Sequence, residues 1–155
     1  MESFDAWYDR EHDRMIATLL LTTGDLELAV DGVDEACSRA LERWPRVSSM
    51  ESPSGWVYRV AMNHASRLAR RRKTEERLFR KLVPKPDLPA PAGEIWELVA
   101  SLPLRQRQVV MLRYVAELRE GEISAALGIS RGTVSSTLHD ARQRLGKLLT
   151  DNNES

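Results

Sequence analysis

The sequence predicts an all-α protein of two small helical domains joined by a flexible, proline-rich linker. Apolar residues recur at helical spacing over long windows, and no stretch shows the sustained alternation of apolar and polar residues that a strand needs. Four prolines fall within residues 83–93, a composition that favours extended backbone. The predicted organisation is therefore a first domain over residues 1–82, a linker over 83–93 and a second domain over 94–150.

The chain has no net charge, yet its charges are segregated along the sequence. Residues 1–44 hold 11 acids and 4 bases, residues 45–85 hold 3 acids and 11 bases, and residues 86–155 hold 9 acids and 8 bases. An acidic block followed by a basic block indicates two differently charged surfaces, and hence two different macromolecular partners.

The first domain begins with two helices, predicted over residues 4–22 and 26–44. The sequence TGD at 23–25 supplies a stop and a new N-cap, and Pro45 ends the second helix. Cys37, the single cysteine, is expected to be a buried thiol in a reducing compartment. The second helix is predicted to bury Leu28, Ala29, Val33, Ala36, Cys37, Ala40, Leu41 and Trp44.

A polar loop over residues 47–54 leads into a third helix with one basic face. Arg59, Asn63 and Arg67 follow at steps of four, which places them on one side of the helix. The basic run continues with Arg70, Arg71, Arg72, Lys73, Arg77, Arg80 and Lys81. A solvated face is the commonest form of such a run, but its continuity with the polar side of the helix favours contact with a phosphate backbone. Trp56 fits either a core position or an exposed platform for an unpaired base.

The second domain is predicted to contain helices over residues 94–101, 105–116, 119–127 and 131–149, followed by a frayed polar tail. Gly128 suits the left-handed backbone of a tight turn, and Ser130 suits the N-cap of the next helix. The last two helices therefore fit a helix-turn-helix, or a helical hairpin that only packs. The final helix is predicted to bury Val134, Leu138, Ala141, Leu145, Leu148 and Leu149.

Catalysis, cofactors and membrane insertion find no support in the sequence. His12, His64 and His139 lie far apart, and the chain has no glycine-rich phosphate loop, nucleophile elbow or zinc motif. The acids of the first block could hold a metal, but a solvated or partner-facing acidic surface fits them better. No targeting or membrane-spanning segment is recognised, so we expect a cytoplasmic protein without a cofactor or metal.

In order and spacing, four motifs resemble those of the extracytoplasmic-function sigma factors of bacteria, in the sigma-70 family. AVDGVDEA at 29–36 is similar to the family's polymerase-docking helix, and PSGWVYRVAMN at 53–63 is similar to its promoter-melting helix. LPLRQRQVVMLRY at 102–114 and GISRGTV at 128–134 resemble the domain that binds the upstream promoter element. The two domains would then correspond to sigma regions 2 and 4.

The resemblance implies a sigma factor that binds core RNA polymerase, directs it to promoter DNA and helps to open the duplex, with an anti-sigma factor as a further possible partner. The implied polymerase-binding residues are Asp31, Asp34, Glu35 and Arg39. The implied minus-ten residues are Trp56, Arg59, Asn63, Arg67, Arg70, Arg71 and Arg72. The implied minus-thirty-five residues are Arg131, Gly132, Thr133, Ser135, Ser136, His139 and Arg142.

The chain also departs from the family pattern. Ser135, Thr137 and Asp140 stand where the family often has Lys or Arg, which predicts weaker phosphate contact by the recognition helix. Two alternatives follow. One is a simple helix-turn-helix regulator, which would bind promoter DNA tightly without polymerase. The other is a sigma-like interaction protein with weakened DNA binding, which would bind polymerase without starting transcription.

Overall fold

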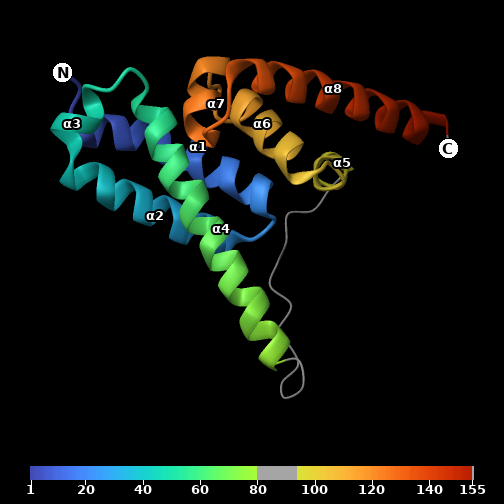
Figure 1. Ribbon diagram of the computed structural model, residues 1–155, viewed down its shortest axis with the longest axis horizontal. Helices are drawn as coiled ribbons and strands as arrows, with labels where there is room; N and C mark the ends of the chain where they lie inside the picture. The colour runs from blue at the N-terminus through green and yellow to red at the C-terminus, as the bar shows by residue number, and fades with distance from the viewer. Residues whose placement is uncertain (80–93, 155) are drawn as a thin grey trace.

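The computed structural model describes residues 1–79 and 94–154, which form helices and no strand (Figure 1). The fold is therefore all-α, as the sequence predicts. The whole predicted linker, residues 83–93, lies outside the described residues. In chain order the helices are α1 (Phe4–Thr23), α2 (Leu26–Glu42), α3 (Trp44–Ser48), α4 (Pro53–Phe79), α5 (Glu94–Ala100), α6 (Leu104–Tyr114), α7 (Glu120–Leu127) and α8 (Arg131–Glu154).

The turn between α1 and α2 forms as its residues predict. Gly24 ends α1 with a left-handed backbone (φ 72°), and its N–H donates to the carbonyl of Leu20. The next residue, Asp25, caps α2 by accepting a 3.1 Å hydrogen bond from the backbone N–H of Leu28. These caps fix where α2 starts and therefore which of its sides faces α1 and α4.

The core of the first half lies where α1, α2 and α4 meet. Met15 of α1, Val33 of α2 and Val57 of α4 are fully buried there. Close approach of α2 to α4 depends on Gly32, where a Cβ would lie only 2.8 Å from the carbonyl oxygen of Ala61. Cys37 is buried as predicted, and burial raises the pKa of its thiol to about 11.

Two predictions about the region between α2 and α4 are wrong. The second helix ends at Glu42, and Trp44 and Pro45 begin the separate short helix α3, which occupies the start of the predicted loop. Pro45 lies in the first turn of α3, where its missing N–H leaves no hydrogen bond unmade. Leu41 is 57% exposed rather than buried, because its neighbour Ala40 occupies the inward position of that turn.

The second half contains the predicted helix-turn-helix, α7 and α8. Gly128 has the left-handed backbone of the turn (φ 66°), and the Ser130 hydroxyl accepts a 3.1 Å hydrogen bond from the N–H of Thr133. Instead of fraying at residue 150, α8 continues to Glu154. Its far end projects away from α6 in Figure 1, and Leu149, predicted to be inward, is 51% exposed.

The two halves pack against each other. Figure 1 places α7 beside the first turns of α4, and α6 beside α1. Buried residues of both halves belong to one continuous apolar cluster. Independent folding of the two halves stays a prediction, but in this structure they are docked. Within the described residues, no helix combines the length and the apolar character that crossing a membrane requires.

Candidate partner surface and nucleic-acid interface

The outer side of α2 combines acidic and apolar residues. Asp31 and Asp34 are exposed, and next to them Val30 is 36% exposed. Glu35 is half-buried and accepts a 2.7 Å hydrogen bond from Arg39 Nε, one turn further along the helix. The four predicted polymerase-binding residues therefore lie on one helix. Among the described residues, the carboxylates of Asp31 and Asp34 form no ion pair, whereas the carboxylate of Glu35 is paired with Arg39.

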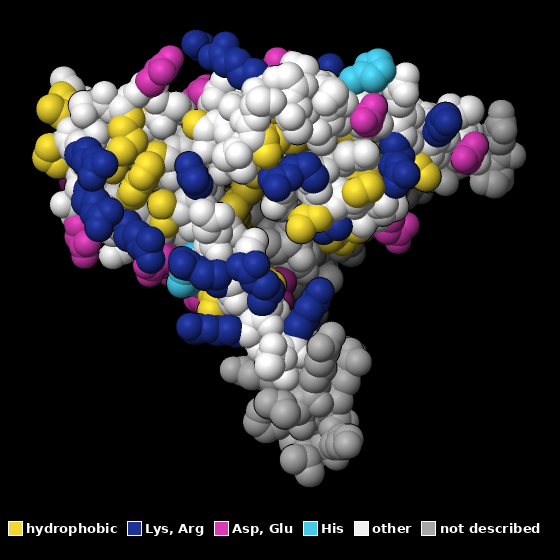
Figure 2. Space-filling view, in the orientation of Figure 1, with side chains coloured by type: hydrophobic (Ala, Val, Ile, Leu, Met, Phe, Trp, Pro, Cys, Tyr) yellow, Lys and Arg dark blue, Asp and Glu magenta, His cyan; other side chains and the backbone are white. Residues whose placement is uncertain are grey.

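The polar side of α4 presents the predicted basic surface. Figure 2 shows Lys and Arg side chains gathered over the lower half of this helix. The exposed residues of this surface are Arg59, Asn63, Arg67, Arg70 and Arg71. The guanidinium groups of the four arginines and the amide of Asn63 can reach phosphates along one strand, because residues three and four apart share a helix face.

Arg72, also predicted to bind DNA, is held by α2. Its Nη1 donates a 2.8 Å hydrogen bond to Asp25, and its Nη2 lies 3.0 Å from a carboxylate oxygen of Glu27. The same Asp25 caps α2, so Arg72 connects the last third of α4 to the start of α2. A residue with two carboxylate partners contributes less positive potential to a DNA surface than its exposed neighbours do.

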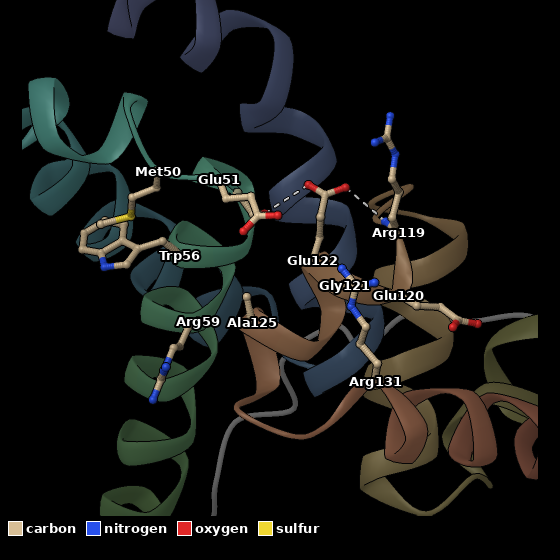
Figure 3. A pocket seen from close by; sticks show the side chains of 11 residues that line it. Met50, Glu51, Trp56, Arg59, Arg119, Glu120, Gly121, Glu122, Ala125 and Arg131 are labelled. Atoms are coloured by element: carbon tan, nitrogen blue, oxygen red, sulfur yellow. Dashed lines mark hydrogen bonds between the residues drawn. The ribbon is translucent and has the colours of Figure 1, made fainter.

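Trp56 and Tyr58, near the start of α4, have different environments. Tyr58 is fully buried, and this burial raises the pKa of its hydroxyl above the usual value. Trp56 is half-buried and lines an open cleft beside Met50 (Figure 3). Of the two aromatic rings, Trp56 is therefore the one that can stack on an unpaired base.

The recognition helix α8 has the predicted division into two sides. Val134, Leu138 and Ala141 are buried against the rest of the domain. All seven predicted minus-thirty-five residues are exposed: Arg131, Gly132, Thr133, Ser135, Ser136, His139 and Arg142. Because these seven residues are exposed, this side of α8 can face a major groove.

Several of these exposed groups have partners within the chain. Ser135 donates a 2.7 Å hydrogen bond to the carboxylate of Glu120 on α7. Arg142 Nε donates a 2.7 Å hydrogen bond to the Tyr114 hydroxyl. DNA binding by these residues must therefore replace contacts that already exist. Glu120 also adds a negative charge beside the recognition helix, which opposes the approach of phosphate.

An open cleft of about 850 Å³ is lined by residues 50–52, the first turns of α4, the N-terminal part of α7 and Arg131 at the start of α8 (Figure 3). Across its edge, the Ser52 hydroxyl donates a 3.1 Å hydrogen bond to a carboxylate oxygen of Glu122. The sequence places Ser52 in the predicted polar loop and Glu122 in the predicted helix-turn-helix, but it does not predict their contact, because 70 positions separate them. No group of three metal-ligating side chains is close enough to hold an ion among the described residues.

The chain matches two family models in chain order. Sigma-70 region 2 matches residues 7–75, and sigma-70 region 4 matches residues 92–145. The first match covers α1 to most of α4, including the acidic side of α2 and the exposed basic residues of α4. The second covers the helix-turn-helix and the outward residues of α8.

Proteins with similar sequences are named as RNA polymerase sigma factors. An RNA polymerase sigma-E factor from Streptomyces antibioticus is 33% identical over 128 residues, which are 76% of this chain and 68% of that protein. The ECF RNA polymerase sigma factor SigW from Bacillus subtilis is 27% identical over 169 residues, covering 97% of this chain and 90% of that one.

A solved structure has the same fold. The sigma factor RpoE from Bartonella quintana, solved in complex with the anti-sigma factor NepR, is 18% identical with a TM-score of 0.77; the match covers 95% of this chain and 96% of that one. From the two matched regions, their order and these relatives, the chain belongs to the extracytoplasmic-function group of the sigma-70 family of RNA polymerase sigma factors.

Proposed function

We propose that this sigma factor uses α2 to dock on core RNA polymerase, α4 to engage the minus-ten element and α8 to read the minus-thirty-five element. In this role it recruits polymerase to promoters and helps to start transcription. Its contribution is binding free energy, and no bond is made or broken by its own side chains. The observation that carries the proposal is the outer side of α2, where exposed apolar and acidic residues adjoin one another.

Docking through α2 is supported by the composition of that side. Val30 and Leu41 are apolar and exposed, while Asp31 and Asp34 place negative charge near them. Apolar residues rimmed by charge are typical of protein–protein interfaces, in which the apolar part supplies affinity and the charges speed and orient encounter. A partner with a basic, partly apolar surface fits this side.

The minus-ten assignment rests on Trp56 followed by exposed arginines on one face of α4. In promoter opening, Trp56 would stack on an unpaired base while Arg67, Arg70 and Arg71 hold phosphates. The sequence-based assignment also included Arg72, but its ion pairs with Asp25 and Glu27 favour a structural contribution.

A second candidate is a sigma factor whose upstream contact is weak. Glu120 lies against Ser135, and Arg142 is engaged with Tyr114. With Asp140 nearby in sequence, α8 offers few free positive groups to phosphates. Promoter affinity would then come mainly from α4, and α8 would contribute selectivity.

Charge reversal tests the docking surface. Asp31→Lys is expected to weaken binding to core polymerase about tenfold. Close charge pairs at interfaces commonly contribute at least about 1.4 kcal/mol, which corresponds to a tenfold change in affinity. Asp9→Lys is the matched control, because Asp9 is exposed on α1, outside the proposed surface. Fluorescence anisotropy of labelled protein with purified core polymerase measures both. Equal affinities for the two variants would refute docking through α2.

A further inference from the structure

A second cavity lies where α1, α2, α4 and α6 meet, and none of its lining residues belongs to the sets assigned to polymerase or DNA. Its volume is about 260 Å³. One part of the lining is aliphatic and comes from all four helices: it is formed by Leu19, Leu28, Met62, Ala65, Ala69 and Leu104. Because Leu19, Leu28, Met62 and Ala65 are buried, this part offers an apolar ligand a dry contact surface.

The rest of the lining is polar, and its charges are all positive. Hydroxyl and amide groups come from Thr22, Thr23, Ser66 and Gln108. The two charges come from Lys73 of α4, which is exposed, and Arg107 of α6, which is half-buried. Within the described part of the chain, no carboxylate lines this cavity. Aliphatic walls combined with a few polar and charged groups are typical of small-molecule sites.

The charge of Arg107 has no counter-ion among the described residues. Its Nη1 donates a 2.9 Å hydrogen bond to the carbonyl of Thr22, and its Nη2 donates a 3.3 Å hydrogen bond to the carbonyl of Leu102. Its Nε is buried and has no acceptor in the described part of the chain. Neutral carbonyls orient the guanidinium but leave its charge uncompensated. Since charged groups removed from water are normally paired, an anion beside Arg107 would be stabilised.

Acids close to the cavity along the chain are already engaged. Asp25 and Glu27 lie between the lining residues of α1 and Leu28, and both are paired with Arg72. Lys73 forms no ion pair with any described residue. The cavity therefore keeps two positive groups that no carboxylate of its surroundings neutralises, which favours a negatively charged ligand group.

The volume limits the size of the ligand. About 260 Å³ corresponds to about nine water-sized groups at about 30 Å³ each. A nucleotide is too large for this space. A phosphate ion would leave the aliphatic part of the lining without a partner. An anionic group carried by a short apolar body fits both the volume and the lining.

We propose that this cavity binds a small monocarboxylic acid with an apolar body of about seven carbon atoms. The apolar body contacts Leu19, Met62 and Leu104, and the carboxylate faces Lys73 and Arg107. Binding at this cavity requires neither polymerase nor DNA, so it goes beyond the promoter function and is measured with the protein alone.

Calorimetric titration of the full-length protein tests the proposal. The probes are heptanoate and benzoate, which have about the required size and differ in the shape of the apolar body. Their neutral amides, heptanamide and benzamide, match them in size but lack the charge. We expect at least one acid to bind at one site with a Kd of about 1 mM or tighter, and its amide to bind at least about tenfold more weakly. Failure of both acids to bind, or amides that bind as tightly as the acids, would overturn the proposal.

Two pairs of variants locate the binding site. Ala69→Leu fills the cavity and should abolish binding, whereas the control Ala6→Leu adds the same side chain at an exposed position near the start of α1. Lys73→Met removes the exposed charge and should weaken binding of the acid about tenfold, while Lys147→Met removes an exposed charge of α8, outside this cavity. Both controls should bind as the wild type does. Equal affinities within both pairs would place the ligand elsewhere and refute the assignment.

Thermal unfolding gives an independent readout. The ligand contacts α6 as well as α1 and α4, so it binds the folded chain and not the unfolded one. At about ten times its Kd, it should raise the Tm of the wild type by about 3–6 °C. The Tm of Ala69→Leu should not respond. A Tm shift of the same size in Ala69→Leu would mean that the acid acts at other sites, and an unchanged wild-type Tm would contradict binding to the folded protein.

Discussion

Replacing Gly32 by Ala probes the packing that presents the docking side of α2. The added Cβ would lie 2.8 Å from the carbonyl oxygen of Ala61, 3.0 Å from Leu19 Cδ2 and 3.4 Å from Ala65 Cβ. Leu19 can adjust its side chain, but the carbonyl belongs to the backbone of α4. Relief therefore requires α2 and α4 to move apart, which loosens the contact between these helices.

Two effects of opposite sign determine the result. Overpacking a well-filled core costs about 1–3 kcal/mol, and a backbone neighbour places this site near the upper value. Alanine is the better helix former by about 1 kcal/mol. The expected net loss is about 2 kcal/mol in the free energy of unfolding. For a chain of this length, each kcal/mol corresponds to about 2–4 °C, so the Tm should fall by about 4–8 °C.

Gly146→Ala is the matched control, since its Cβ would meet nothing within 4 Å. Only the helix-propensity gain remains there, so this variant should be more stable by up to about 1 kcal/mol. Urea and thermal unfolding followed by circular dichroism compare both variants with the wild type. A Gly32→Ala protein as stable as Gly146→Ala would refute the reasoning, because it would mean that α2 and α4 are not in close backbone contact.

Three further predictions concern single side chains. Arg72→Ala should lower the free energy of unfolding by about 1 kcal/mol, because partly exposed ion pairs are lost. Arg71→Ala should leave urea unfolding unchanged and weaken DNA binding. The reverse pattern would exchange the roles of the two arginines. Glu120→Gln removes a negative charge beside Ser135. At low salt, this variant should bind a minus-thirty-five duplex about twofold more tightly in an anisotropy titration. An unchanged affinity would place Glu120 away from the phosphates. Burial raises the pKa of the Cys37 thiol from 9.0 to about 11, so alkylation of this thiol at pH 8 should be slow until the chain unfolds. The stabilising contribution of the neutral thiol should be present below pH 9 and lost toward pH 11. Fast alkylation of the native protein, measured by mass spectrometry, would contradict the burial of Cys37.

Features determined by neighbouring residues could be predicted from the sequence. Asp25 caps the helix that begins at the next residue by accepting a hydrogen bond from the N–H three residues on, and Gly128 and Ser130 form a turn within a few positions. Such chemistry is local, so residue type and spacing are sufficient to recognise it. The order of the motifs then indicated both sigma regions and the sides of the helices that carry the candidate residues.

Features that depend on tertiary placement could not be predicted in the same way. Periodicity identifies an apolar position on a helix but not the element that covers it, which is why Leu41 and Leu149 were misassigned. The same reason applies to Arg72, whose carboxylate partners lie 45 and 47 positions earlier in the chain. Contacts between the halves, such as Arg107 with Thr22 over 85 positions, carry no local signal.

The central claim is that this chain directs core RNA polymerase to promoters. Run-off transcription with purified core polymerase on genomic DNA fragments tests it most directly. The account predicts discrete transcripts that require this protein, and their loss when Arg67, Arg70 and Arg71 are replaced by Ala together. Transcripts that persist in the triple variant would remove the assigned role of the α4 basic surface. Tight binding to core polymerase without any transcript would contradict the account and favour the sigma-like interaction protein instead.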